Sequence, residues 1–380
     1  MNKRKEFAWR AIATENFRAL CAEYGISTKT GYKWKARLLE HGLAGPRELS
    51  RRPRGHAKEL GEAVVCEIIR IKHAHLSWGP RKLRKVYERT HSPVPSQSSF
   101  KRVLDRAGLV EPRRLRCGGE YGGLFSGRKA AAANEIWRVD FKGWWRVGGL
   151  RCEPLTVRDE FSRYVLDVRA VADGRTTTVR ACFERLFEQK GLPGAIRSDN
   201  GSPFASVEGV LGLSRLSAWW VALGIDLERG GPGCPPDNGA HERLHLDIQK
   251  ELRAQGLADQ QAGLDEWRQT FNHERPHESL GMRCPAEFYT KSQRKYAGSP
   301  EDLVYEPMDS RRVNCVGEIS LEAKRIFIST ALAGWSVGLE PCGPSRYHVY
   351  FGRLRLGQLA ESTAAFVRTN IGPQIKKEAA

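Results

Sequence analysis

Residues 136–147 read IWRVDFKGWWRV and mark the point at which the character of the chain changes. Apolar and polar side chains alternate here, as they do in a strand with one buried face. The runs EPLTVRDEF (153–161) and RYVLDVRAV (163–171) have the same texture, and residues 176–190 follow with a helical pattern. Three strands followed by alternating helix and strand predict an α/β core with a mixed sheet.

Three acidic residues of this core stand where secondary structure can gather them. Asp140 lies in the first predicted strand, on the same face as Arg138. Asp199 ends the short apolar strand GAIRSD, and ligand crevices form at the strand ends of α/β sheets. Glu242 falls in the first turn of a predicted helix, for which Asn238 is a credible N-cap.

Carboxylates of this kind suit divalent-metal chemistry. Hard cations prefer oxygen ligands, and two of them can clamp the attacking and leaving oxygens of a phosphodiester. Taken singly, each acid also has a plain structural alternative. Asp140 can pair with Lys142, Asp199 can cap a turn, and Glu242 can serve only the helix dipole.

The neighbours of the three acids resemble those of a known family. W-R-V-D-F-K (137–142), S-D-N-G-S-P-F (198–204) and P-P-D-N-G-A-H-E-R-L-H (235–245) are similar to the three motifs of the retroviral-integrase-type core of bacterial insertion-sequence transposases. The stretch FNHERPHESLGMRCPAEFY (271–289) resembles the segment after the catalytic helix of that family. The resemblance covers about residues 134–290, and it identifies Asp140, Asp199 and Glu242 as the catalytic metal ligands.

The resemblance implies an RNase H-like fold that uses Mg²⁺ or Mn²⁺, with two ions expected. It implies a DNA transposase: water first cleaves the transposon end, and the freed 3′-OH then attacks target DNA. The implied partners are double-stranded DNA, as terminal repeats and as target, and further copies of the chain in a homo-oligomer on that DNA. One departure is that 42 residues separate Asp199 from Glu242, more than the family's commonest spacing. We expect the extra length within 203–217.

The charge of the chain is unevenly distributed. The net charge is +18, and residues 1–130 hold 29 Lys/Arg against 12 Asp/Glu. The other 250 residues hold 33 against 32, so almost the whole excess lies in the first third. This distribution favours a polyanion-binding arm, and DNA or RNA is the obvious polyanion. No apolar run reaches the length of a membrane span, so we expect a cytoplasmic, nucleoid-associated protein without membrane contact.

Residues 14–42 and about 58–110 have helical patterns. Residues 1–55 are predicted to form a helix-turn-helix unit with a basic linker, and 56–112 a second such unit. The alternative for the first unit is an ordinary helical hairpin with a solvated basic face, and the alternative for its linker is a plain flexible tether. Residues 113–133, rich in Gly and Arg, are a predicted linker between these units and the core. The residues expected to contact DNA, here or on the helix of Glu242, are Lys29, Thr30, Lys33, Arg37, Arg51, Arg52, Arg54, Arg243 and Lys250.

The core is assigned to residues 134–295, and the short strand-like runs of 296–380 predict a small β-barrel or sandwich. Nine scattered cysteines indicate reduced thiols without a zinc module. His241 and His245 flank Glu242 four residues apart, and we expect them to face DNA or solvent. Four tryptophans are expected to pack in the core or between domains, with base stacking as the alternative. These four are Trp144, Trp145, Trp219 and Trp220.

Two rival functions remain open at this point. A sequence-specific DNA-binding regulator with an inactive core would keep the helix-turn-helix arm without the chemistry. A hydrolytic nuclease of the same fold would cleave DNA without joining ends. No nucleophile-elbow motif and no phosphate-binding Gly-Lys-Ser/Thr loop is present, so neither serine nucleophilic catalysis nor ATP use is implied.

Overall fold

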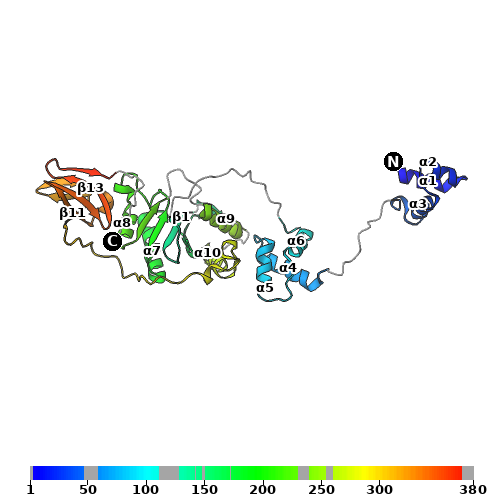
Figure 1. Ribbon diagram of the computed structural model, residues 1–380, viewed down its shortest axis with the longest axis horizontal. Coiled ribbons are helices and arrows are strands. Elements are labelled where there is room, and N and C mark those ends of the chain that lie inside the picture. Colours follow the sequence, from blue (N-terminus) through cyan, green and yellow to red (C-terminus); the bar gives the residue numbers. More distant parts are fainter. Residues whose placement is uncertain are drawn as a thin grey trace. The chain divides into compact units, whose positions relative to one another are not determined.

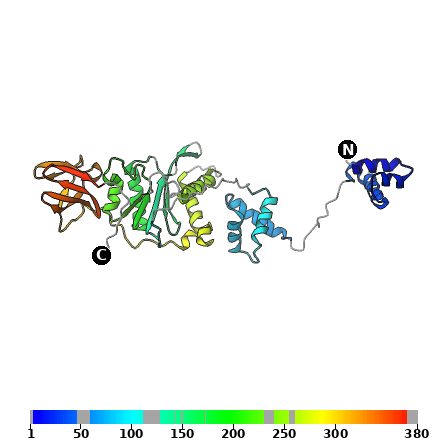
Figure 2. The ribbon, with the colours of Figure 1, turned by 45° about the horizontal axis from the view of Figure 1, so that its top comes forward.

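A computed structural model of the chain describes residues 3–46, 59–110, 128–141, 143–147, 150–171, 173–229, 239–253 and 260–369. The chain divides into two compact units, residues 1–62 and 63–380. Figure 1 labels the elements, and Figure 2 shows them from a second direction. No helix among the described residues is long and apolar enough to cross a membrane.

The first unit contains three helices: α1 (Lys3–Ala13), α2 (Phe17–Glu23) and α3 (Thr28–His41). The side chains of Asn16 and Ser27 cap α2 and α3 by accepting hydrogen bonds from backbone amides. Gly31 lets α3 approach its neighbours, because a Cβ there would lie 2.7 Å from the Cys21 sulfur. The sequence analysis missed α1, whose Phe7 is nevertheless fully buried beneath the other two helices.

A second group of helices opens the larger unit: α4 (Glu62–Ala74), α5 (Pro80–Glu88) and α6 (Gln97–Arg106). Pro80 stands in the first turn of α5, and Ser96 caps α6 by accepting a hydrogen bond from the Ser99 amide at 3.2 Å. Leu83 and Phe100 are fully buried between these helices. The three helices expected in this region are therefore present.

The α/β core is built on a five-stranded mixed sheet with the order β5-β4-β1-β6-β7. Its strands are β1 (Ile136–Phe141), β4 (Pro154–Asp159), β5 (Val165–Ala170), β6 (Ala195–Ser198) and β7 (Asp226–Arg229). The central strand β1 runs antiparallel to β4 and parallel to β6. A hairpin of β2 (Trp145–Val147) and β3 (Leu150–Cys152) lies between β1 and β4 in the chain. The expected mixed sheet is confirmed.

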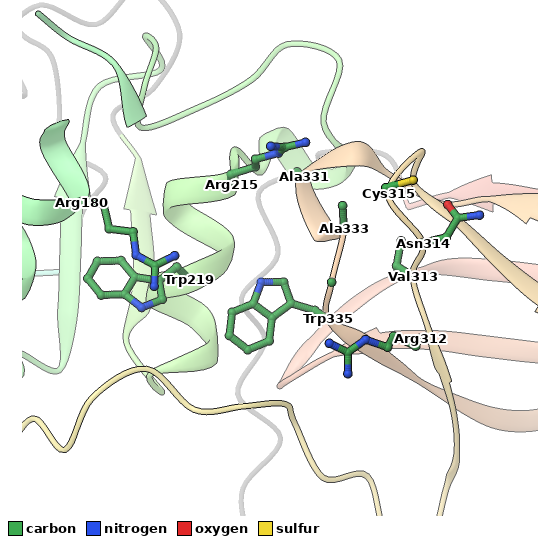
Figure 3. A pocket seen from close by; sticks show the side chains of 11 residues that line it. Arg180, Arg215, Trp219, Arg312, Val313, Asn314, Cys315, Ala331, Ala333 and Trp335 are labelled. Carbon is green, nitrogen blue, oxygen red and sulfur yellow. The ribbon is translucent and has the colours of Figure 1, made fainter. Parts of the chain in front are cut away.

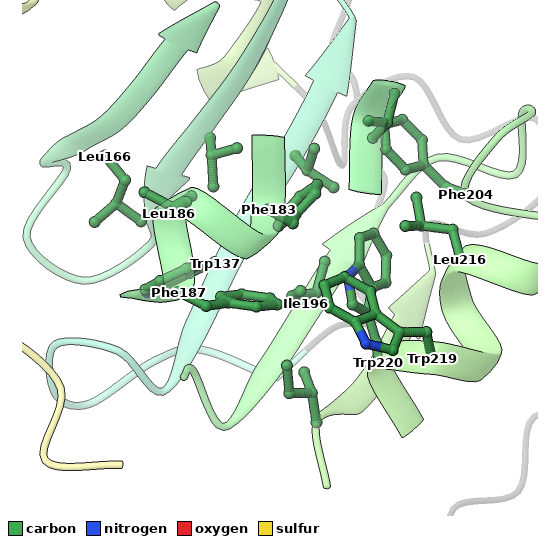
Figure 4. Close-up of a cluster of buried hydrophobic side chains, with 14 of the residues drawn as sticks. Trp137, Leu166, Phe183, Leu186, Phe187, Ile196, Phe204, Leu216, Trp219 and Trp220 are labelled. Carbon is green, nitrogen blue, oxygen red and sulfur yellow. The ribbon is translucent and has the colours of Figure 1, made fainter. Parts of the chain in front are cut away.

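Helices cover both faces of this sheet. The helices are α7 (Thr176–Lys190), α8 (Arg215–Ala222), α9 (Gly239–Arg253) and α10 (Gln260–Gln269). Trp137 and Ile196 share a hydrophobic cluster with α7 and α8, which includes the predicted core residues Trp219 and Trp220 (Figure 4). A second cluster joins α9 and α10 to Val165 of β5. One face of β1 is therefore apolar and packed, which leaves the polar face for Asp140.

The C-terminal part is an all-antiparallel β domain, as expected. Its five-stranded sheet has the order β14-β13-β12-β11-β8, and β9 pairs with β10 separately. The strands are β8 (Asp309–Arg312), β9 (Glu318–Leu321), β10 (Lys324–Phe327), β11 (Ser336–Gly343), β12 (Arg346–Phe351), β13 (Leu354–Ala360) and β14 (Ala365–Arg368). Its apolar interior continues into the core through Val210, Leu213 and Ala218.

Candidate functional site

Asp140 and Asp199 lie on neighbouring parallel strands. The pairing of β1 with β6 joins Ile136 to Ala195 and Arg138 to Arg197. The same offset, carried two residues further, brings Asp140 level with Asp199, which directly follows β6. Neighbouring strands lie about 4.8 Å apart, so this offset sets the backbones of Asp140 and Asp199 near one another at the same end of the two strands.

The environments of these two carboxylates differ. Asp140 is half-buried, whereas Asp199 is exposed. Asp199 also accepts a hydrogen bond from the Gly201 amide at 3.2 Å, so it does cap a turn as well. A Cβ on Gly201 would lie 3.0 Å from the Asp199 carboxylate, so a larger residue there would shift that side chain slightly.

Helix α9 is fixed to the same face of the sheet through Thr156 of β4. Thr156 pairs with Asp140 in the β1–β4 register, and its hydroxyl donates to the Asp140 carbonyl oxygen at 3.0 Å. The same hydroxyl lies 2.7 Å from Nε2 of His241 and 2.8 Å from Nε2 of His245. Thr156 therefore connects the strand of the first aspartate to the first turns of the helix that carries Glu242.

His241 and His245 are interior residues, which corrects the expectation that they face DNA or solvent. His241 is fully buried and His245 is 9% exposed. Because the Thr156 hydroxyl already donates its proton to a carbonyl, both Nε2 atoms have to donate to it, which fixes their tautomers. Burial, with the nearby charge of Arg158, lowers the pKa of His241 well below its ordinary value, so the ring is neutral. A pair of histidines four residues apart on a helix looks the same in sequence whether it faces solvent or a buried hydroxyl.

A row of buried arginines crosses the same polar face. Arg138 pairs in register with Arg158 of β4 on one side and with Arg197 of β6 on the other. All three are less than 7% exposed. The glutamates Glu160 and Glu228 neutralise the row: Glu160 is in ion pairs with Arg138 and Arg197, and Glu228 accepts from Arg197 Nε at 2.9 Å.

The buried arginines and Glu160 of this row shift one another's pKa values. Burial lowers the pKa of Arg158 to about 9, with the positive charges of Arg163 and Arg138 adding to the effect. Burial opposes ionisation of Glu160, but the hydrogen bond and charge of Arg138 outweigh it and hold the Glu160 pKa below its ordinary value. The sequence analysis placed Arg138 on the polar face without foreseeing that the row is buried, because strand alternation does not report what covers a face.

Arg275 holds α9 from its other side. Its guanidinium donates to Asp247 at 2.6 Å and to Glu251 at 3.1 Å, and the residue is 3% exposed. Trp267 of α10 donates to the second oxygen of Glu251 at 2.6 Å. Arg275 belongs to the stretch FNHERPH, which the sequence analysis singled out without assigning a role to any of its residues. Its observed contacts anchor the helix that carries Glu242.

Glu242 is exposed in the first turn of α9, on the side away from Leu244, Ile248 and Leu252, which are buried as predicted. Among the described residues, no group of three or more His, Cys, Asp and Glu side chains lies close enough together to hold a metal ion. The structure thus brings Asp140 and Asp199 to one edge and sets α9 beside it. It does not bring the three carboxylates into one ligand cluster.

The residues predicted to contact DNA differ in their exposure, and the structure does not describe all of them. Lys29 and Lys33 are exposed on α3, and Thr30 and Arg37 of that helix are partly exposed. Arg243 and Lys250 are exposed on α9, and Arg243 pairs with Asp247 at 3.3 Å. Three further candidates lie outside the described residues, as does the predicted helix cap Asn238; they are Arg51, Arg52 and Arg54.

Trp144 is 58% exposed, which corrects the expectation that it packs in the core or between domains. Lys142, which the sequence offered as a partner of Asp140, lies outside the described residues.

The segment 203–217, to which the extra spacing before Glu242 was assigned, packs against the C-terminal β domain. Val210 and Leu213 are fully buried in the cluster shared with that domain. Arg229 of β7 fixes the segment by donating to the Gly212 carbonyl oxygen at 3.0 Å. Burial lowers the pKa of Arg229, which the negative charge of Asp199 opposes. The segment 203–217 therefore helps to hold the β domain against the core.

Family models match most of the regions described above. Residues 130–235 and 223–285 match models described as integrase core domain, and residues 30–104 match a homeodomain-like domain. The chain thus contains a helix-turn-helix region followed in sequence by an integrase core. The homeodomain-like match runs from α3 to α6, across both helical groups.

Related proteins come from insertion elements. The chain is 28% identical over 239 residues to an uncharacterized 31.7 kDa protein of insertion element IS407 from Burkholderia multivorans, covering 60% of this chain and 82% of that protein. It is 27% identical over 272 residues to an uncharacterized 39.2 kDa protein of insertion element IS476 from Xanthomonas euvesicatoria, covering 66% and 74%. The catalytic core of a bovine immunodeficiency virus (BIV) integrase is similar at 23% identity and a TM-score of 0.33, over 41% of this chain and 93% of that one.

Proposed function

We propose that this chain is a DNA transposase that cleaves the ends of its element and joins their 3′-OH groups to target DNA. The observation that carries the proposal is the parallel pairing of β1 with β6, because Asp140 of β1 and Asp199 directly after β6 follow the offset of this pairing. Thr156 of β4 joins the strand of Asp140 to the helix of Glu242. The integrase core match and the relatives from insertion elements support the same activity. Acting on DNA, the protein would work in the cytoplasm at the nucleoid.

The donor set fits a hard divalent cation such as Mg²⁺ or Mn²⁺. All three proposed ligands, Asp140, Asp199 and Glu242, offer carboxylate oxygens, the ligand type such ions prefer. When bound, two such ions would stabilise the negative charge on the attacking and leaving oxygens of the phosphodiester. Glu242 completes the set in this proposal by turning its exposed side chain from the first turn of α9 toward the two aspartates.

The remaining residues of the site position the carboxylates and the DNA. Thr156 and its two histidines hold the start of α9 against β4, so that Glu242 begins close to the strand of Asp140. Arg243 and Lys250, on the exposed side of α9, are proposed to contact DNA phosphates. Two ends have to be brought together in transposition, so we propose that the chain works as a homo-oligomer on DNA.

The test uses the full chain, Mg²⁺, and a duplex ending in the terminal repeat found beside its coding region. Products in which the repeat is joined to a second duplex are the expected result. Nicks without joining would replace the proposal with a nuclease, and a mobility shift without cleavage would replace it with a DNA-binding regulator. The Asp140→Asn chain should bind the duplex as the unaltered chain does and yield neither nicks nor joined product.

A further inference from the structure

A cavity of about 650 Å³ lies between the core and the C-terminal β domain, and none of its residues belongs to the proposed catalytic site. The core contributes Arg180 of α7 together with Arg215 and Trp219 of α8. The β domain contributes Arg312, Asn314 and Trp335. Figure 3 shows these side chains on facing elements, with the Trp335 ring between Trp219 and Arg312.

The lining of this pocket is cationic. Three arginines line it, and no aspartate or glutamate does. Arg215 is exposed at the start of α8 and forms no ion pair with any residue that the structure describes. Arg312 pairs with Asp302 at 3.5 Å, but its side chain is 66% exposed. Both guanidiniums therefore keep donors available for an anion from solvent.

Arg180 is held in place before any ligand arrives. Its guanidinium lies 4.8 Å from the Trp219 ring centre and donates to Ser299 at 2.9 Å, and its Nε donates to Glu184 at 2.9 Å. Trp219 also donates to the Ser299 hydroxyl at 2.7 Å. A preorganised guanidinium loses less conformational entropy on binding a phosphate than a free one.

The two walls of the pocket are joined by a common apolar cluster. Ala218, one residue before Trp219, is buried with Val337 and Leu339 of β11. Glu208 of the core accepts a hydrogen bond through its carbonyl oxygen from Arg368 of β14 at 2.9 Å. The arginines of the core and of the β domain therefore face one another in a fixed arrangement.

We propose that this pocket binds a phosphodiester group of the DNA backbone, which gives the C-terminal β domain a role in holding DNA. Guanidiniums bind phosphate through paired, charge-assisted hydrogen bonds, and three around one cavity match a polyanion. The choice of DNA rests on the proposed function, since a chain that processes DNA presents that polyanion at high local concentration. A free nucleotide is the other ligand that a cavity of this size admits.

The experiment measures binding of the full chain to a fluorescent duplex without divalent metal, at several salt concentrations. The variant Arg215→Ala/Arg312→Ala removes two pocket charges. The matched control Arg353→Ala/Arg355→Ala removes two exposed charges from the same β domain outside the pocket. We expect the pocket variant to bind several-fold more weakly and its slope of log K against log salt to be shallower by about two. The control should change the slope by less than half that amount.

Three outcomes would contradict the proposal, each in a distinguishable way. A pocket variant with the slope of the unaltered chain overturns the phosphate site while leaving the transposase proposal intact. A pocket variant that loses binding of a fluorescent deoxynucleoside monophosphate but keeps its duplex affinity overturns the choice of DNA. An unaltered chain that binds no duplex overturns both proposals together. If the Asp140→Asn chain loses joined product but keeps its slope of log K against log salt, the catalytic site and the pocket act independently, as both proposals require.

Discussion

The hydroxyl of Thr156 lies 2.7 Å from Nε2 of His241, and both residues are fully buried. Thr156 also donates to the backbone of Asp140, so a single hydroxyl joins the strand of one proposed metal ligand to the helix of another. A buried polar contact of this kind is costly to break, because the groups left behind lose both water and partner. We therefore regard Thr156 as a positioning residue for Glu242.

Thr156→Val should separate positioning from folding. Valine keeps the shape but removes the hydroxyl, so it should lower the free energy of unfolding by about 1–3 kcal/mol. It should also slow joining of DNA ends while leaving duplex affinity unchanged, because no proposed DNA contact is touched. Thr156→Ser restores the hydroxyl and should recover most of the joining rate. Equal joining rates for the valine and serine variants would show that the hydroxyl does not position α9.

Glu242→Gln tests the proposed ligand that the structure leaves apart from the aspartates. Glutamine keeps the length of the side chain and removes its charge, so metal-dependent cleavage and joining should both fall below detection. Duplex affinity without metal should stay within about twofold, since the exposed residue makes no phosphate contact in the proposal. Asp226→Asn, an exposed acid at the start of β7, is the matched control and should retain activity. An active Glu242→Gln chain would remove this residue from the site.

Deletion of residues 1–58 should weaken DNA binding and flatten its salt dependence. This segment carries 14 Lys/Arg and five Asp/Glu, and it ends before α4. It leaves intact the compact unit from residue 63 onward, so the remaining chain should keep its cooperative unfolding transition. Lost phosphate contacts reduce the slope of log K against log salt by about 0.9 each. An unchanged slope would refute the basic arm as a DNA-binding element.

Arg275→Met should strongly destabilise the larger unit. The change leaves the carboxylates of Asp247 and Glu251 without their buried partner, which costs about 3–5 kcal/mol in unfolding free energy. Arg283 provides the comparison, because its pair with Glu287 at 2.8 Å is exposed, and Arg283→Met should cost less than about 1 kcal/mol. Denaturant titration of both variants measures the difference. Similar costs would mean that the buried position of Arg275 does not matter.

The free energy of unfolding should decrease as the pH is lowered below neutrality, because of His277. Burial, with the charges of Arg275 and Lys82, lowers the pKa of His277 in the folded chain to about 3. The unfolded chain titrates near its ordinary pKa of about 6.5, so between these values it binds a proton that the folded chain does not. The free energy of unfolding therefore decreases from pH 6.5 downward, by at most about 1.4 kcal/mol per unit from this group.

The measurement is denaturant unfolding at pH 7.5, 6.5 and 5.5. His277→Asn should lose less stability over this range than the unaltered chain, because the titrating group is gone. His273→Asn removes an exposed histidine four residues earlier in the same segment and is the matched control. Identical pH profiles for the chain with and without His277 would contradict its depressed pKa.

Local sequence patterns determined much of this protein. Alternation from Ile136 to Phe141 predicted β1 and the polar face of Asp140, and residues 176–190 form the predicted helix α7. Ser27 and Ser96 cap the starts of α3 and α6, and an N-cap acts within one turn of its own residue. Such features depend on neighbours in the chain, so a single sequence contains the information.

Tertiary structure alone decided what covers each face and which distant residues meet. The level placement of Asp140 and Asp199 comes from the pairing of two strands far apart in the chain. His241 proved to be interior because Thr156, 85 residues away, lies opposite it. Helical spacing states that two residues share a face, but burial depends on the partner that packs there, and that partner is chosen by the whole fold.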